Sequence, residues 1–166
     1  MVEIPPRRRG DRGEKGRRVT APAKRFVGRC GLYCGSCFIY AVSHEPALAD
    51  RRRRAAAEWN CPEDAVTCEG CGALTPSCWG NDCRVLQCLN GRGLAFCDGC
   101  AEIDACATFG DVDGRYDGVP RRNLARRRAV GEDAWLAEQA TERACRACGR
   151  PVIYGGEKCA YCGAAL

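Results

Sequence analysis

The stretch that decides the fold is Cys-Gly-Leu-Tyr-Cys-Gly-Ser-Cys at residues 30–37, in which three cysteines follow the spacing C-x3-C-x2-C. Gly31 and Gly35 lie beside the sulfurs, where a metal-binding turn needs close backbone approach and a positive φ. Nine more cysteines follow between residues 61 and 106, and four lie between residues 145 and 162, giving 16 in a chain of 166 residues. This pattern predicts a small fold organised around thiolate-bound metal.

The cysteine content is typical of either a secreted disulfide scaffold or an intracellular metal protein. The segment Met1 to Lys24 is polar and basic, and no apolar stretch of the kind found in a secretory signal follows it. No run of 18 apolar residues indicates a membrane span. We therefore predict a cytoplasmic protein, of bacterial type, whose cysteines bind metal rather than form disulfides.

The basic charge is concentrated at one end of the chain. Residues 1–25 carry nine Lys or Arg and three Asp or Glu, whereas the other 141 residues carry 17 and 18. The composition of residues 1–25 predicts a disordered basic tail. Such a tail is a candidate nucleic-acid contact through phosphate neutralisation, although a solvated tail is the simpler interpretation.

The remainder divides into three expected parts: a Cys-rich metal-binding module at 26–110, a short helical linker at 111–143 and a zinc ribbon at 144–166. Helical patterns begin at Phe38 and cover 47–59, whereas 68–106 is predicted to be rich in loops. Asp, Gly and Pro residues predict turns over 111–120, followed by two helices over 121–130 and 132–143. The expected fold is an irregular module of α-helices and loops, stabilised by metal.

The N-terminal module contains two C-x2-C pairs, at 68–71 and 97–100, which place two sulfurs in one tight turn. Zn²⁺ is the favoured metal, and a [4Fe–4S] cluster is the alternative. Spacing does not determine how the ligands pair. Cys61 and the single histidine, His44, are further candidates, with a surface histidine the simpler interpretation of His44. The predicted ligands are Cys30, Cys34, Cys37, Cys68, Cys71, Cys78, Cys83, Cys88, Cys97, Cys100 and Cys106.

The last four cysteines form two C-x2-C-Gly turns, Cys145 to Gly149 and Cys159 to Gly163. Tetrahedral Zn²⁺ takes four thiolates, and a site closed in this way is structural. We expect Val152, Ile153 and Tyr154 between the turns to form a strand. Cys145, Cys148, Cys159 and Cys162 are thus predicted to hold Zn²⁺ in a ribbon with β-hairpin knuckles.

The string Cys-Gly-Leu-Tyr-Cys-Gly-Ser-Cys-Phe-Ile-Tyr at 30–40 resembles the opening of the domain of unknown function 3795 family, small cysteine-rich proteins of bacteria and archaea. The resemblance continues through Cys-Glu-Gly-Cys at 68–71, the string at 83–88, Gly-Arg-Gly-Leu-Ala-Phe-Cys-Asp-Gly-Cys at 91–100, and Cys106. One form of the family has a helical linker and a terminal zinc ribbon, as expected here. The resemblance implies metal binding but no reaction.

Three functions fit these observations. The favoured one is a zinc-stabilised structural or adaptor module that binds a macromolecular partner, most simply a protein. The first alternative is an iron–sulfur electron-transfer protein with its clusters in residues 30–106, and the second is a thiol redox or metal-delivery protein. No paired carboxylates, nucleophile motif or phosphate-binding loop stand out, so the sequence does not favour an enzyme.

Overall fold

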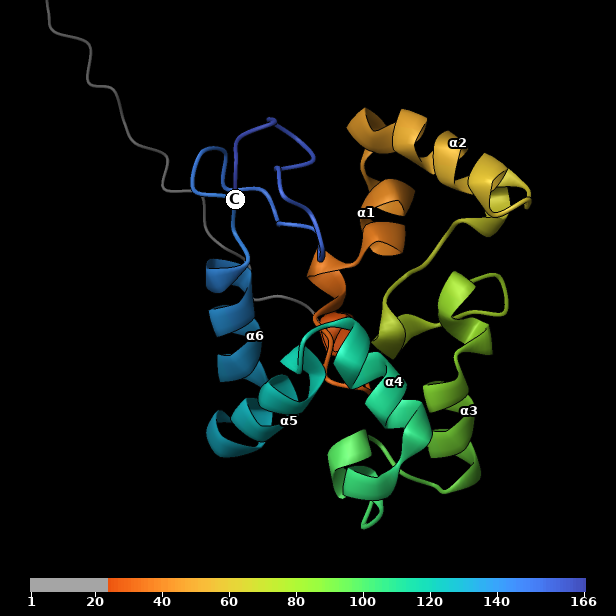
Figure 1. Cartoon of the computed structure of the whole chain (residues 1–166), viewed down its shortest axis with the longest axis vertical. Coiled ribbons are helices and arrows are strands. Elements are labelled where there is room, and N and C mark those ends of the chain that lie inside the picture. The colour runs from red at the N-terminus through yellow and green to blue at the C-terminus, as the bar shows by residue number, and fades with distance from the viewer. Residues whose placement is uncertain (1–23) are drawn as a thin grey trace, which may run out of the picture.

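The computed structural model describes residues 24–166, and over this range the protein is helical (Figure 1). The helices predicted from Phe38, over 47–59, over 121–130 and over 132–143 are confirmed, with bounds within two residues of those expected. The α-helices are α1 Phe38–His44, α2 Ala49–Glu58, α3 Arg84–Gly91, α4 Ala107–Arg115, α5 Val119–Val130 and α6 Glu132–Glu142. Short 3-10 turns lie between several of them, and three of these turns each contain one cysteine: Cys34, Cys71 and Cys97.

Two helices differ from the sequence-based expectation. Helix α3 lies within the stretch predicted as loops; its apolar residues Val85 and Leu89 are buried in the core. Helix α4 continues to Arg115, through residues predicted as a turn-rich linker, because its Phe109 is fully buried against α3 and α5. Burial of one apolar face outweighs the weak helix propensity of Gly and Asp.

The predicted β-hairpin knuckles are wrong. Among residues 24–166 no strand forms, and the C-terminal segment, residues 144–166, contains only two isolated bridges, Ala144 with Pro151 and Lys158 with Ala165. The chain between the turns does not form a strand because Tyr154 directs its backbone N–H away, to the carbonyl of Ser36 at 3.0 Å. The fold is therefore helices and turns throughout the described residues.

Helices α5 and α6 pack directly on the opening cysteine motif. Gly31 has φ +96°, and a Cβ at this position would lie 2.2 Å from the carbonyl oxygen of Pro120 in α5. Asn123 donates a hydrogen bond from Nδ2 to the Gly31 carbonyl at 2.8 Å. Tyr33 meets the buried ring of Trp135 of α6 edge to face, with 6.3 Å between centroids. The glycine is thus required both by its φ and by the close approach of α5.

The C-terminal segment also contacts the beginning of the described chain, and Figure 1 shows it running from α6 toward α1. The backbone N–H of Tyr33 donates to the hydroxyl of Tyr154 at 3.1 Å. Ile153 and Tyr161 pack on the cluster of buried residues formed by α1 and α2. The two cysteine-rich ends of the described chain therefore share packing and hydrogen bonds.

The predicted disordered tail over residues 1–25 lies outside the described residues, except for Lys24 and Arg25, which begin a 3-10 turn. Within residues 24–166, every helix is too short or too polar to span a bilayer.

Candidate metal centres

The C-terminal cysteines form a compact four-sulfur group. All four Sγ atoms lie within 4.8 Å of one another, with 3.8 Å between Cys145 and Cys162 and 3.7 Å between Cys148 and Cys159. Zn–S bonds of about 2.3 Å in a tetrahedron place the sulfurs about 3.8 Å apart. The group therefore has the dimensions of a single-ion tetrathiolate site.

The same backbone hydrogen bonds build both turns of this group. Gly149 N–H donates to Cys145 O at 2.7 Å, and Gly163 N–H donates to Cys159 O at 2.9 Å. Both glycines have φ near +70°, at 70° and 74°, and a Cβ at either would meet nothing within 4 Å. The glycines are therefore needed for their left-handed backbone rather than for close packing.

Cys145 and Cys159 are buried, whereas Cys148 and Cys162 lie nearer the surface. Burial opposes ionisation of Cys159, but N–H groups of Tyr161 and Cys162 and the neighbouring thiols point at its sulfur and lower its pKa to about 6. The opposite holds for Cys148: an N–H of Arg150 favours its thiolate, but desolvation and the neighbouring thiols raise its pKa to about 12. A bound cation is therefore needed to ionise all four sulfurs.

A second set of cysteines lines a cavity of about 240 Å³ between the opening motif, the Cys68–Cys71 turn and the start of α3. Arg29, Leu74, Tyr116 and Tyr154 also line it. The cysteines of this set, called here the central set, are Cys30, Cys34, Cys37, Cys68, Cys71 and Cys83.

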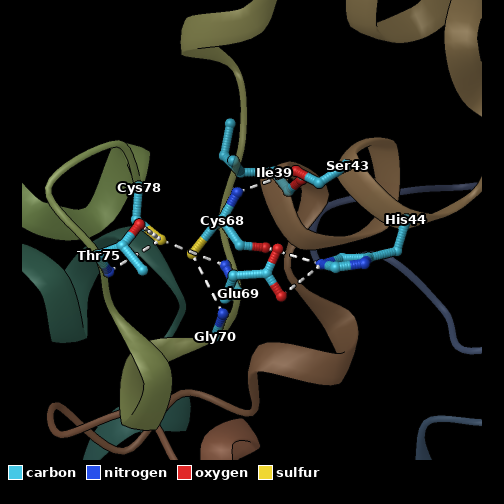
Figure 2. Close-up of polar contacts among 8 residues, drawn as sticks. All are labelled: Ile39, Ser43, His44, Cys68, Glu69, Gly70, Thr75 and Cys78. Atoms are coloured by element: carbon cyan, nitrogen blue, oxygen red, sulfur yellow. Dashed lines mark hydrogen bonds and ion pairs between the residues drawn. The ribbon is translucent and has the colours of Figure 1, made fainter.

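Backbone N–H groups point at several sulfurs of the central set. Arg29 N lies 3.5 Å from Cys71 Sγ, and Cys71 N lies 3.4 Å from Cys34 Sγ. Cys78, which does not line the central cavity, lies beside Cys68 of the central set (Figure 2), and the Cys78 sulfur accepts hydrogen bonds from Glu69 N at 3.4 Å and from Thr75 N at 3.3 Å. Such hydrogen bonds favour the thiolate, as metal ligation requires.

The central sulfurs are costly to ionise without a cation. Burial, together with the nearby thiols, raises the pKa of Cys30 to about 12 and the pKa of Cys34 well above its usual range. Burial also raises the pKa of Cys68 to about 11. A bound metal would supply the missing positive charge and displace the protons.

A third set, called here the outer set, surrounds a small cavity of about 20 Å³ at the junction of α3 and α4. Burial and the thiols around it raise the pKa of Cys97 to about 12. Among the described residues, the C-terminal group is the one set of three or more Cys, His, Asp or Glu side chains whose ligand atoms lie close enough together to hold a single ion. The outer set consists of Cys88, Cys97, Cys100 and Cys106.

Arg29, which the sequence analysis did not single out, connects the central and outer sets. Its backbone N–H points at Cys71 Sγ, and its carbonyl accepts from Cys97 N at 3.0 Å. Its guanidinium donates to Ala95 O at 2.8 Å and to Asn90 Oδ1 at 2.6 Å, which holds the loop after α3. Nothing in the sequence distinguishes it among the many arginines of the chain.

The two further candidates, His44 and Cys61, line neither the central nor the outer cavity. His44 Nε2 is 3.0 Å from the carbonyl oxygen of Cys68 and 3.6 Å from the carboxylate of Glu69 (Figure 2). Its ring stacks on Tyr40 with 4.3 Å between centroids. Cys61 lines neither cavity and packs on the core formed by α1 and α2. Both side chains have structural contacts that account for them.

A helical, cysteine-rich fold with one cysteine group able to hold a metal ion defines the class of this protein. Residues 26–111 match the family described as protein of unknown function (DUF3795), so the chain belongs to this family and the predicted resemblance is confirmed. The C-terminal group follows the matched region, and its four cysteines fit the expected terminal extension. No curated protein and no solved structure matches the chain.

Proposed function

We propose that this is a metal-binding protein in which Cys145, Cys148, Cys159 and Cys162 hold one structural Zn²⁺. The observation that carries the proposal is the spacing of the four sulfurs: two of the sulfur–sulfur distances, 3.8 Å and 3.7 Å, match the edge of a zinc tetrathiolate tetrahedron, and all four sulfurs lie within 4.8 Å of one another. Four protein ligands leave no open position for substrate, and this supports a structural rather than a catalytic ion.

The zinc would fix the C-terminal segment in the shape that docks on the opening motif. Tyr154 and Tyr161 lie between or within the two turns, and their packing on the helices depends on how the turns are held. The binding energy of a structural Zn²⁺ is about 10–16 kcal/mol in small domains, enough to order a segment of this size. On this proposal the metal completes the fold of the described chain.

The proposed biological role is that of a structural or adaptor module for a macromolecular partner. Support comes from two exposed tryptophans, Trp59 and Trp79, which stack with 4.8 Å between centroids and are 39% and 42% exposed. Exposed aromatic pairs are common in protein–protein contacts. If this pair is the contact, the Trp79→Ala variant will no longer cross-link to the cellular partner. The matched control, Tyr161→Phe, should cross-link as well as wild type. Undiminished cross-linking by Trp79→Ala would contradict the proposal.

Metal analysis of the Cys148→Ala variant tests the zinc proposal, with Cys61→Ala as the matched control. We expect the Cys148 variant to lose about one zinc per chain and the Cys61 variant to lose none. Equal zinc contents in the two variants would show that the C-terminal group does not hold the ion.

Iron–sulfur electron transfer is the second candidate function, and the arrangement of the N-terminal cysteines favours it. Six cysteines of the central set line a cavity of about 240 Å³, which is room for a group larger than a single ion. Val85 lines both cavities, so the two sets lie on either side of one side chain. Iron, acid-labile sulfide and visible absorption in protein purified without oxygen would support this candidate, and zinc alone in all three sets would exclude it.

A further inference from the structure

We propose that the central cavity holds a [4Fe–4S] cluster whose four ligands are Cys30, Cys34, Cys37 and Cys71. The inference deepens the second candidate function and rests on it. It selects four ligands from the 12 N-terminal cysteines, a choice that the cysteine spacing does not determine.

The first support is the space that the central set surrounds. Its cavity has a volume of about 240 Å³, whereas the outer cavity has about 20 Å³, which is room for about one water molecule. The four sulfurs of the C-terminal group lie within 4.8 Å of one another, as a single ion requires. A cluster of four irons and four sulfides needs far more space than one ion, and of these three cysteine groups the central set alone provides it.

The second support is the way two turns, distant in sequence, reach each other's sulfurs. The opening motif brings three thiols to the wall of the cavity, and the fourth, Cys71, comes from the second turn. The backbone N–H of Cys71 lies 3.4 Å from Cys34 Sγ. In return, the backbone N–H of Arg29, directly before the opening motif, lies 3.5 Å from Cys71 Sγ. This reciprocal contact places Cys71 with the three thiols of the opening motif around one cavity.

The other two cysteines of the central set have different surroundings. Cys68 lies beside Cys78, and its sulfur accepts the backbone N–H of Gly70 at 3.4 Å (Figure 2). Cys83 is exposed and also lines a second cavity, between α3 and α4. The four proposed ligands are each at least partly buried, and none of them lines that second cavity.

The third support is the lining of the central cavity, which suits an anionic cluster shielded from water. Leu32, Phe38 and Leu74 supply apolar walls, and Tyr154 of the C-terminal segment also lines the cavity. Arg29 adds a positive charge to the lining. Apolar surroundings and N–H donors to cysteine sulfur stabilise iron–sulfur clusters and tune their potentials.

The test compares two full-length double variants, Cys34→Ala/Cys71→Ala in the central set and Cys97→Ala/Cys100→Ala in the outer set. Both are prepared without oxygen, with iron and sulfide supplied, and iron, acid-labile sulfide and zinc are measured per chain. We expect the central-set variant to contain about four fewer iron and four fewer sulfide than wild type, and the outer-set variant to keep the wild-type iron content. The central-set variant should keep the wild-type zinc content, which reports that the C-terminal group is intact.

Equal iron contents in the two variants, or loss of iron from the outer-set variant alone, would overturn the inference but leave the second candidate function standing. Wild-type protein without iron would exclude both, and the proposed C-terminal zinc site would remain. If the central-set variant does not fold, Cys71→Ser decides, because an oxygen ligand in place of the thiolate changes the electron paramagnetic resonance spectrum of the reduced cluster. A spectrum identical to that of wild type would show that Cys71 is not a ligand.

Discussion

Removing one hydroxyl, in Tyr154→Phe, tests whether the C-terminal segment is docked on the opening cysteine motif as the structure shows. The hydroxyl accepts the backbone N–H of Tyr33, a largely buried residue, at 3.1 Å. Phenylalanine keeps the ring beside Tyr116 and under the guanidinium of Arg143, so only the hydrogen bond is lost. A buried donor left without a partner costs about 1–3 kcal/mol. For a protein of this size we expect a fall in Tm of about 2–8 °C.

Thermal unfolding of the fully metallated protein, followed by circular dichroism, measures the effect. Tyr161→Phe is the matched control, because Tyr161 lies in the same segment and its hydroxyl makes no hydrogen bond within residues 24–166. We expect the control to lower the Tm by less than about 1 °C. Equal Tm values for Tyr154→Phe and the control would refute the docking argument, since the contact would then contribute nothing to stability.

Three further outcomes follow from the same structure. Gly31→Ala should destabilise the protein by about 2–4 kcal/mol, because Gly31 has a positive φ and the added methyl group would meet the backbone of α5. Gly110→Ala, in open space within α4, should be neutral or stabilising. Denaturant titration measures the free energy of unfolding of both variants. Arg127→Lys should lower the free energy of unfolding by about 2 kcal/mol, because Arg127 makes two hydrogen bonds to the partly buried Asp98 and stacks on Phe96. Arg126→Lys, at the more exposed pair with Glu138, should lower it by less than about 0.5 kcal/mol. Equal losses in the two variants would contradict the burial argument. A strong zinc chelator at neutral pH should remove the ion from the C-terminal group, and the backbone amides of residues 145–166 should then exchange their hydrogens faster. If those amides stay fully protected after the zinc is removed, the zinc is not structural.

Local features of the described chain were predictable from sequence. The left-handed glycines after Cys148 and Cys162 and the hydrogen bonds that close each C-x2-C turn depend on neighbours within five residues. The helices α2, α5 and α6 carry strong helix formers, and their predicted positions are confirmed. Helix α3 and the first half of the expected 111–120 linker were missed, because their helical state depends on burial of Val85, Leu89 and Phe109 against distant residues.

The sequence by itself determined that the chain belongs to its family, that the last four cysteines form one group, and that the opening motif needs a glycine at Gly31; the positive φ also expected at Gly35 does not occur. Only the tertiary structure divided the N-terminal cysteines into central and outer sets and placed Cys61 in the core of α1 and α2. The physical reason is the range of the forces involved. A turn brings two sulfurs together through backbone hydrogen bonds a few residues apart, whereas the meeting of separate turns depends on apolar packing of α3, α4 and α5, which no spacing encodes.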